Sequence, residues 1–291
     1  MSEEKVYNLM EMSWVDVQEW LKKTDIILVP MGSMERHGPH LPLGTDSFHT
    51  WEVTVRAARK ADVPHTPIVP YGYSPHHMHK EGFGAGTITL RSKTVQNLIY
   101  DIAKSLLYHG FSKIIFVAAH GSYSWVIEPI LRHLRYETGG FFAWYKPFYE
   151  RDIGPLKEIL ENPPEETPGW HSSEMETSQI MRVAQILGKP YLVRMERATK
   201  ELAHAPAWLG PKFIKKDGVR QVMFEGAENI ILPMEHYEYS ETGVIGNPFR
   251  ATPEKGEKIF EAQATHLANF VNEIKKIKIT VRNRDFSERS W

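Results

Sequence analysis

IILVPMGSMERHGPHLPLGTD, the stretch from Ile26 to Asp46, decides the fold expected for this chain. It opens with a short apolar run that Pro30 and Gly32 interrupt, which is typical of a buried strand leaving a sheet. Open α/β sheets keep their ligand sites beyond the carboxyl ends of their strands. We therefore expect the polar residues that follow the run to form a functional loop at that edge.

Carboxylates and imidazoles crowd this loop, at Glu35, His37, His40 and Asp46. Such groups are costly to bury together unless something pairs with them, and a bound cation is the usual partner. Asp46 also has a simpler explanation, because residues 46–61 fit a helix and a carboxylate is stabilised at a helix N-terminus without a metal. We interpret the loop as half of a metal site.

Composition and charge exclude several classes of protein. Lys and Arg total 35 against 36 Asp and Glu, so no basic field would gather nucleic acid or anionic lipid. No window reaches the ~18 apolar residues of a membrane span, and the charged N-terminus lacks the apolar core of a signal peptide. The absence of cysteine excludes disulfides, thiolate nucleophiles and Cys-based zinc sites. We expect a cytoplasmic protein with neither nucleic-acid nor membrane partners.

Strand and helix patterns alternate along the chain. Strands are expected at residues 26–29, 66–70, 113–119, 140–145 and 228–233, and helices at about 13–23, 46–61, 92–109, 125–134, 172–187 and from 252 onward. This alternation predicts a three-layer α/β/α sandwich with a mostly parallel sheet, as one domain over residues 1–291. The charged tail, about 275–291, fits either a last edge strand or an interface arm.

Later loops supply further candidates at the same edge. His120 directly follows the apolar run 113–119 and precedes a glycine, a position poor for packing and good for ligation. Glu174 and Glu176 lie in the first turn of a helix just after His171, and a helix dipole accounts for one such glutamate more readily than for two.

The loop 71–87 is rich in glycine and histidine and has no hydrophobic period, so we expect it to lie on the surface or over a site. Its histidines, His76, His77 and His79, are too closely spaced to converge easily on one ion. We therefore favour contact with solvent or substrate over ligation for them.

Carboxylate and imidazole ligands of this kind suit Zn, Mn or Fe better than Ca or Cu(I), and their number exceeds what a tetrahedral zinc needs. The chain thus favours a dinuclear site. The run from Glu35 to Asp46 (ERHGPHLPLGTD) resembles the signature of the creatininase family, the creatinine amidohydrolase-like proteins. The likeness continues through Gly86-Thr87, His120-Gly121, 171–178 and 242–248, and covers about residues 25–270.

The resemblance implies an α/β/α hydrolase, often a homohexamer, that holds two divalent ions, Zn and/or Mn, with iron as an alternative. It implies that one ion is held by Glu35, Asp46 and His120. The other ion would be held by His37, Asp46 and Glu176, with Asp46 as the bridge. By the same resemblance His171 is the catalytic proton carrier.

The stretch 118–124 (AAHGSYS) departs from the family pattern. Creatininase carries Asn-Gly-His-Tyr-Glu-Asn there, so both asparagines and the acid are missing, which argues against creatinine itself as the substrate. The loop 73–84 also looks lengthened over the site. Tyr123, Trp170 and His79 are candidate substrate contacts, although packing explains a buried aromatic equally well.

These observations predict a dinuclear hydrolase that opens a small cyclic carbonyl compound, with a creatinine-like cyclic amide as the first choice. The alternatives are opening of a cyclic diketone such as a diketo-inositol, as in 3-dehydro-scyllo-inosose hydrolase, or hydrolysis of a formamide. A protein that only binds metal or sugar is the non-enzymatic alternative, and it would require both ions to be fully coordinated by protein.

Overall fold

A computed structural model describes residues 5–79, 82, 84–147, 155–161, 163–166, 171–215 and 221–290. Its centre is a parallel sheet in the order β1-β2-β3, formed by β1 (Ile26–Pro30), β2 (Lys113–Val117) and β3 (Phe141–Tyr145). The pairing is in register, with Ile26 opposite Lys113 and Lys113 opposite Phe141. Every residue of β1 and β2 is buried, as expected for strands covered on both faces.

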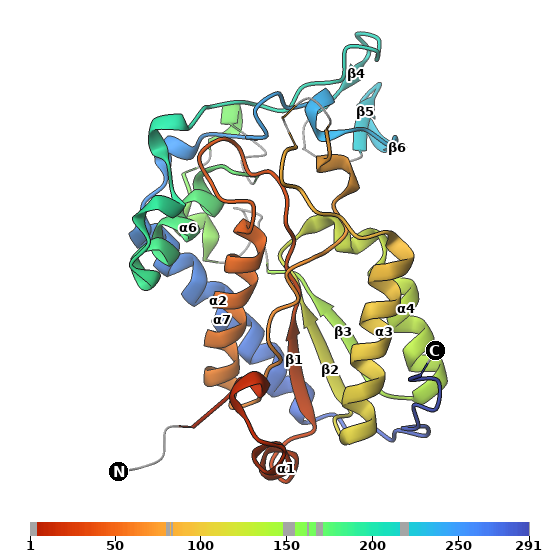
Figure 1. Ribbon diagram of the computed structural model, residues 1–291. Helices are drawn as coiled ribbons and strands as arrows, with labels where there is room; N and C mark the ends of the chain where they lie inside the picture. Colours follow the sequence, from red (N-terminus) through yellow and green to blue (C-terminus); the bar gives the residue numbers. More distant parts are fainter. Residues whose placement is uncertain are drawn as a thin grey trace.

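Helices cover both faces of this sheet (Figure 1). One face packs against α2 (Thr45–Ala61), α6 (Glu174–Leu187) and α7 (Pro253–Lys275), and the other against α3 (Ser92–His109) and α4 (Ile127–Thr138). Alternate residues of β1 point into the two cores: Leu28 joins the first and Ile27 the second. The predicted three-layer α/β/α arrangement with a parallel sheet is confirmed.

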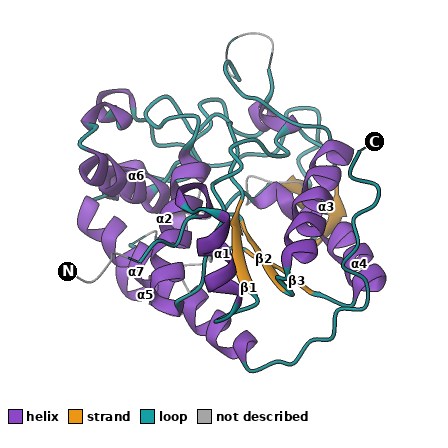
Figure 2. Cartoon of the chain, turned by 60° about the horizontal axis from the view of Figure 1, so that its bottom comes forward, coloured by secondary structure: helices purple, strands orange, loops and turns teal. Residues whose placement is uncertain are grey.

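A small antiparallel sheet lies beyond the carboxyl ends of the central strands (Figures 1 and 2). It consists of β4 (Phe213–Ile214), β5 (Gln221–Phe224) and β6 (Ala227–Ile231). The strand expected at 228–233 therefore exists, but it pairs in this separate sheet. Its chain leads directly into the 3-10 turn η7 (His236–Glu238), which approaches the loop after β1 through Arg36 and His236.

The prediction of a strand at residues 66–70 is wrong, because this segment does not form a regular strand. This segment runs parallel to β1, and Thr66 and Val69 donate to the carbonyls of Leu28 and Pro30, but the structure records only isolated bridges there. Proline lacks an N–H group, and the prolines at 64, 67 and 70 remove the donors that a continuous ladder needs.

Several helix boundaries follow the expected capping signals. Ser13 and Asp16 form a capping box at α1 (Trp14–Leu21), and Thr252 caps α7 with Pro253 at the first helical position. The helix expected from 125 instead begins at Ile127, after the 3-10 turn η3 (Gly121–Trp125). Among the described tail residues, Lys276 to Ser290, none forms a strand, so the edge-strand alternative is wrong.

The remaining elements are short. They are α5 (Leu156–Ile159), η1 (Leu9–Glu11), η2 (Pro75–His77), η4 (Pro164–Glu166), η5 (Pro190–Leu192), η6 (Met195–Arg197) and η8 (Pro248–Arg250). Over the described ranges, no helix has both the length and the apolar character that crossing a membrane requires.

Candidate metal centre

The predicted ligands meet at the carboxyl ends of β1 and β2. The loop after β1 carries Glu35 and His37, the first turn of α2 carries Asp46, and His120 follows β2. Glu176 reaches the same place from the first turn of α6. All of these side chains are buried, and they form two groups of three whose ligand atoms lie within 4.8 Å of one another.

The first group consists of Glu35, Asp46 and His120. His120 Nδ1 lies 3.0 Å from Glu35 Oε2 and 3.3 Å from Asp46 Oδ2. The other ring nitrogen, Nε2, lies 2.8 Å from the carbonyl oxygen of Tyr73. Because a carbonyl only accepts, Nε2 carries a proton there, and Nδ1 is the nitrogen that faces the two carboxylates.

The second group consists of His37, Asp46 and Glu176, and it repeats this arrangement. His37 Nδ1 lies 3.2 Å from the carbonyl oxygen of Glu35, so it donates there. His37 Nε2 lies 3.8 Å from Asp46 Oδ1 and 3.6 Å from Glu176 Oε2. Asp46 thus presents one oxygen to each group, as a bridging carboxylate would.

The donor set fits divalent ions. His37 Nε2 is buried and has no hydrogen-bond partner among the described residues, and Glu35 Oε2 faces the ring nitrogen of His120 at 3.0 Å. A lone pair that faces carboxylates is repelled unless a proton or a cation lies between them. Imidazole ligands held by a hydrogen bond from the opposite nitrogen to a carbonyl are typical of metal sites.

Without a cation, protons must balance this charge. Burial alone would lower the pKa of His37, but the carboxylates of Asp46, Glu176 and Glu35 raise it. The pKa of His120 is raised well above its usual value by Glu35 and Asp46, against the effect of burial. Burial raises the pKa of Glu176, and the charge of Asp46 adds to this. A bound cation would oppose all three shifts, because it stabilises the carboxylates and disfavours protonated histidines.

His171, the predicted proton carrier, lies beside the second group. Its ring centre is 4.4 Å from that of His37, and its Nε2 lies 3.2 Å from the carbonyl oxygen of Arg36. Burial, reinforced by the charge of His37, lowers the pKa of His171 well below its usual value. A neutral His171 that donates through Nε2 keeps Nδ1 as its basic nitrogen.

His40, on the same loop, belongs to neither group. It is buried, and its Nε2 lies 3.0 Å from Thr177 Oγ1. Burial lowers the pKa of His40 to about 4, so the ring is neutral near pH 7. This histidine joins the loop after β1 to α6.

Of the two contacts expected for His76 and His77, the one with solvent is wrong, because both side chains are buried, and the one with substrate stays a prediction. His77 Nε2 lies 3.2 Å from Glu35 Oε1, because the 3-10 turn η2 bends the closely spaced histidines toward the centre. His236 was not predicted at all, although its ring lies 4.4 Å from that of His77. Its only signal in the sequence is its position a few residues before the stretch 242–248, which resembles the family.

The candidate substrate contacts have different surroundings. Tyr123 is fully buried, and its hydroxyl donates to the carbonyl oxygen of Gly32 over 2.9 Å, which accounts for the side chain without a substrate. His79 is partly exposed and packs against Tyr237, with ring centres 4.1 Å apart. Trp170 lies outside the described residues.

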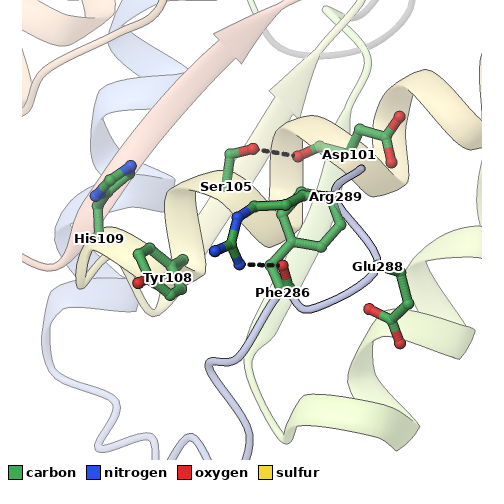
Figure 3. Close-up of a pocket in the computed structure, with 7 residues that line it drawn as sticks. All are labelled: Asp101, Ser105, Tyr108, His109, Phe286, Glu288 and Arg289. Atoms are coloured by element: carbon green, nitrogen blue, oxygen red, sulfur yellow. Dashed lines mark hydrogen bonds between the residues drawn. The ribbon is translucent and has the colours of Figure 1, made fainter. Parts of the chain in front are cut away.

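A separate cavity of about 450 Å³ lies between α3 and the C-terminal tail (Figure 3). Its lining includes Asp101, Tyr108 and Arg289, and Arg289 donates to the carbonyl of Phe286. Helix α3 ends shortly before Ser112, whose backbone N–H donates to the carbonyl of Asp25, just before β1. The cavity therefore lies toward the amino ends of the strands, opposite the candidate centre.

Known proteins resemble the chain over nearly its whole length. The creatininase family model, described as creatinine amidohydrolase, matches residues 10–271. A 3-dehydro-scyllo-inosose hydrolase of Thermotoga maritima is 28% identical, over 90% of this chain and 82% of its own. Creatinine amidohydrolase of Pseudomonas putida is 25% identical, over 90% and 95%. A mycofactocin precursor peptide peptidase of Mycolicibacterium smegmatis is 28% identical, over 81% and 79%.

Solved creatininase structures share the fold. A crystal structure of creatinine amidohydrolase superposes with a TM-score of 0.70 at 23% identity, covering 94% of this chain and 100% of the other. Two further structures with the same TM-score, identity and coverage are described as a Mn creatininase and as a mutant creatininase of Zn-Zn type.

Proposed function

The chain belongs to the creatininase family of hydrolases, and from this membership we propose that it is a dinuclear-metal-dependent hydrolase that opens a small cyclic carbonyl compound. Glu35, Asp46 and His120 would hold one ion. His37, Asp46 and Glu176 would hold the other. Zn and Mn are the proposed ions, since related structures are described with them, and iron has the same ligand preferences.

One observation carries the proposal: the matching orientations of the His37 and His120 rings. Each ring donates through one nitrogen to a backbone carbonyl and turns the other toward carboxylates. Without a cation, both rings would need a second proton to face this negative charge, which packing alone does not require. Binding of a cation at each position explains both orientations together.

A bound pair of divalent ions lowers the pKa of water from ~15.7 toward ~7 and polarises a carbonyl group. The protein's own side chains position the two ligand groups and move protons. Asp46 fixes the spacing of the two groups, and Ser33 holds its Oδ2 with a hydrogen bond of 2.6 Å. Burial of the whole cluster keeps these interactions strong.

His171 would deliver a proton to the leaving group. The carbonyl of Arg36 holds Nε2–H, so Nδ1 is the nitrogen that takes up and releases the proton. A positioned acid or base of this kind typically contributes a factor of ~10²–10⁴ to the rate. The leaving atom would be nitrogen in a cyclic amide.

A second candidate reaction has carbon as the leaving atom. The 3-dehydro-scyllo-inosose hydrolase of Thermotoga maritima is 28% identical over 90% of this chain. This likeness supports ring opening of a cyclic diketone. The peptidase relative and the predicted formamide hydrolysis use the same attack on a carbonyl. All three alternatives would place the carbonyl at the same metal pair.

The test is a panel assay on protein loaded with Mn or Zn. Cyclic amides, formamides, a cyclic diketone and a short peptide are each incubated with the enzyme, and ring opening or product release is followed by mass spectrometry. We expect turnover of one ring compound that stops when a chelator removes the metal. A protein that binds two ions with no exchangeable coordination position and turns over nothing would support the alternative of a metal-binding protein.

We also propose that the chain forms a homo-oligomer, a hexamer by its family resemblance. Large apolar side chains are exposed at Trp14, Tyr136 and Phe249, on separate elements. Contacts between subunits would remove such side chains from water. Light scattering in solution measures the subunit number directly, and a monomer would contradict this proposal.

A further inference from the structure

Three buried histidines lie next to the candidate centre and outside its predicted ligand set. They are His77 on η2, His171 before α6 and His236 on η7, each 2–4% exposed. One nitrogen of each lies within 4.8 Å of the others, a spacing that would also suit a metal ion. Their hydrogen bonds decide between a metal and another ligand.

Arg36 fixes the tautomer of His236. Arg36 Nη2 lies 2.8 Å from His236 Nδ1, and a guanidinium can only donate, so Nδ1 is the acceptor. The ring proton is therefore on Nε2, which is buried and has no hydrogen-bond partner among the described residues. Ligation through Nε2 would require removal of that proton, which disfavours a metal at this position.

In His236 the nitrogen without a partner in the described residues is a donor, whereas in His77 it is an acceptor. Its Nε2 faces the Glu35 carboxylate at 3.2 Å, and a carboxylate can only accept, so the proton is on Nε2. His77 Nδ1 then keeps a lone pair, and this atom is also buried without a partner in the described part of the chain. A second proton on the ring would add a buried positive charge 4.4 Å from the ring of His236, which is unfavourable.

We propose that His236 Nε2–H and His77 Nδ1 together bind one hydroxyl group of the substrate. The hydroxyl oxygen accepts from His236, and its proton is donated to His77. Hydrogen bonds of about 2.8–2.9 Å on each side can bridge nitrogens up to ~5.7 Å apart, which is compatible with ring centres 4.4 Å apart. A carboxylate or ketone oxygen only accepts, so it would leave His77 facing an acceptor.

This inference rests on the proposed function and narrows its substrate class. His77 also contacts Glu35, a proposed metal ligand, so the bound hydroxyl would lie close to the carbonyl under attack. The substrate is then a cyclic carbonyl compound with a hydroxyl substituent near the carbonyl. A site that hydrogen-bonds a substrate hydroxyl discriminates against the analogue without it, because its own polar groups stay unpaired.

The experiment compares two probes that differ by one hydroxyl, pyrrolidinone and the hydroxypyrrolidinone that carries the group beside its carbonyl. Their binding to Mn-loaded wild type, His236→Phe and His236→Gln is measured by calorimetry, with His109→Phe on the exposed end of α3 as the control. We expect wild type and the control to bind the hydroxylated ring roughly tenfold more tightly. His236→Phe should lose this preference, and His236→Gln, which keeps an N–H donor, should retain part of it.

Equal binding of the two rings by wild type, binding of neither, or an unchanged preference in His236→Phe would overturn the hydroxyl site. A third Mn ion per chain that disappears in His236→Phe would assign the cluster to a metal instead. Long-range proton–nitrogen NMR spectra of protein with isotope-labelled histidine provide a readout independent of binding, and a proton on His236 Nδ1 would also contradict the proposal. If wild type held no metal but still preferred the hydroxylated ring, the dinuclear function would be refuted and the hydroxyl site would stand.

Discussion

Ser33 donates a hydrogen bond of 2.6 Å to Asp46 Oδ2, the same oxygen that lies 3.3 Å from His120. The hydroxyl comes from the loop after β1 and the carboxylate from the first turn of α2, so this bond holds the proposed bridging ligand against the loop that carries Glu35.

Ser33→Ala should therefore weaken metal binding while the predicted ligands stay in place. Loss of a hydrogen bond to a metal ligand typically costs 10–100-fold in metal affinity. The measurement is a competition titration of Mn or Zn against a chelator. Ser105→Ala is the matched control, because the Ser105 hydroxyl is exposed on α3 and bonds to the carbonyl of Asp101 in its own helix. Equal affinity in the two variants would show that Ser33 does not orient Asp46.

Substitution of the ligands should separate the two ions. Asp46→Ala removes the shared carboxylate, so we expect loss of both ions and of activity. His120→Ala removes a ligand of one group only and should leave about one ion per chain, again with no activity. Elemental analysis of purified protein gives the stoichiometry, with the exposed Asp101→Ala as control. Wild type without metal after careful purification would contradict the dinuclear assignment.

His171→Ala should keep both ions and lose turnover by a factor of ~10²–10⁴, the usual contribution of a positioned proton donor. The side chain touches the centre through the ring of His37, but its own Nε2 bonds to the carbonyl of Arg36. Metal content and kcat are measured on the same sample, and the exposed His109→Ala controls for the substitution. Unchanged turnover would remove the role of proton carrier, and loss of an ion would make His171 a ligand.

Local patterns in the sequence predicted the framework of the fold well. The helix expected at 92–109 has these bounds in α3, because its apolar period is regular and Gly110 ends it. The strand 26–29 and its polar loop were also found, since apolar runs and prolines are local signals. The prediction for segment 66–70 was wrong because its prolines lack the N–H groups that a continuous strand pairing needs, although its other N–H groups still bond to β1.

The predicted ligands could be named because the family signature places them at fixed spacings. The burial of His77 beside Glu35 and the place of His236 could not be predicted, because both depend on contacts between distant segments. His77 reaches Glu35 only through the 3-10 turn η2, and His236 is held by Arg36, 200 residues away in the sequence. No periodic pattern in either segment encodes such a contact.

A buried carboxylate away from the centre gives a prediction about pH and stability. Glu166 accepts from Arg250 at 2.6 Å and from Lys200 at 2.7 Å, and it joins η4 to the segment before α7. These bonds, Arg250 first, lower the pKa of Glu166 to about 2 in the folded protein. Because the folded pKa lies below the usual value of about 4.5, this stabilisation is complete above pH 4.5 and is lost as the pH falls toward 2.

Glu166→Gln should lower the free energy of unfolding at pH 7 by about 1.5–3 kcal/mol, the range for hydrogen bonds to a charged group. The difference from wild type should shrink as the pH falls from 4.5 toward 2, because wild type then loses the same charge. Urea unfolding at several pH values measures both quantities. Glu165→Gln removes a neighbouring but exposed carboxylate and should change the free energy of unfolding by no more than about 0.5 kcal/mol. A difference between Glu166→Gln and wild type that stays constant down to the lowest pH would show that the stabilisation does not come from the charge of Glu166.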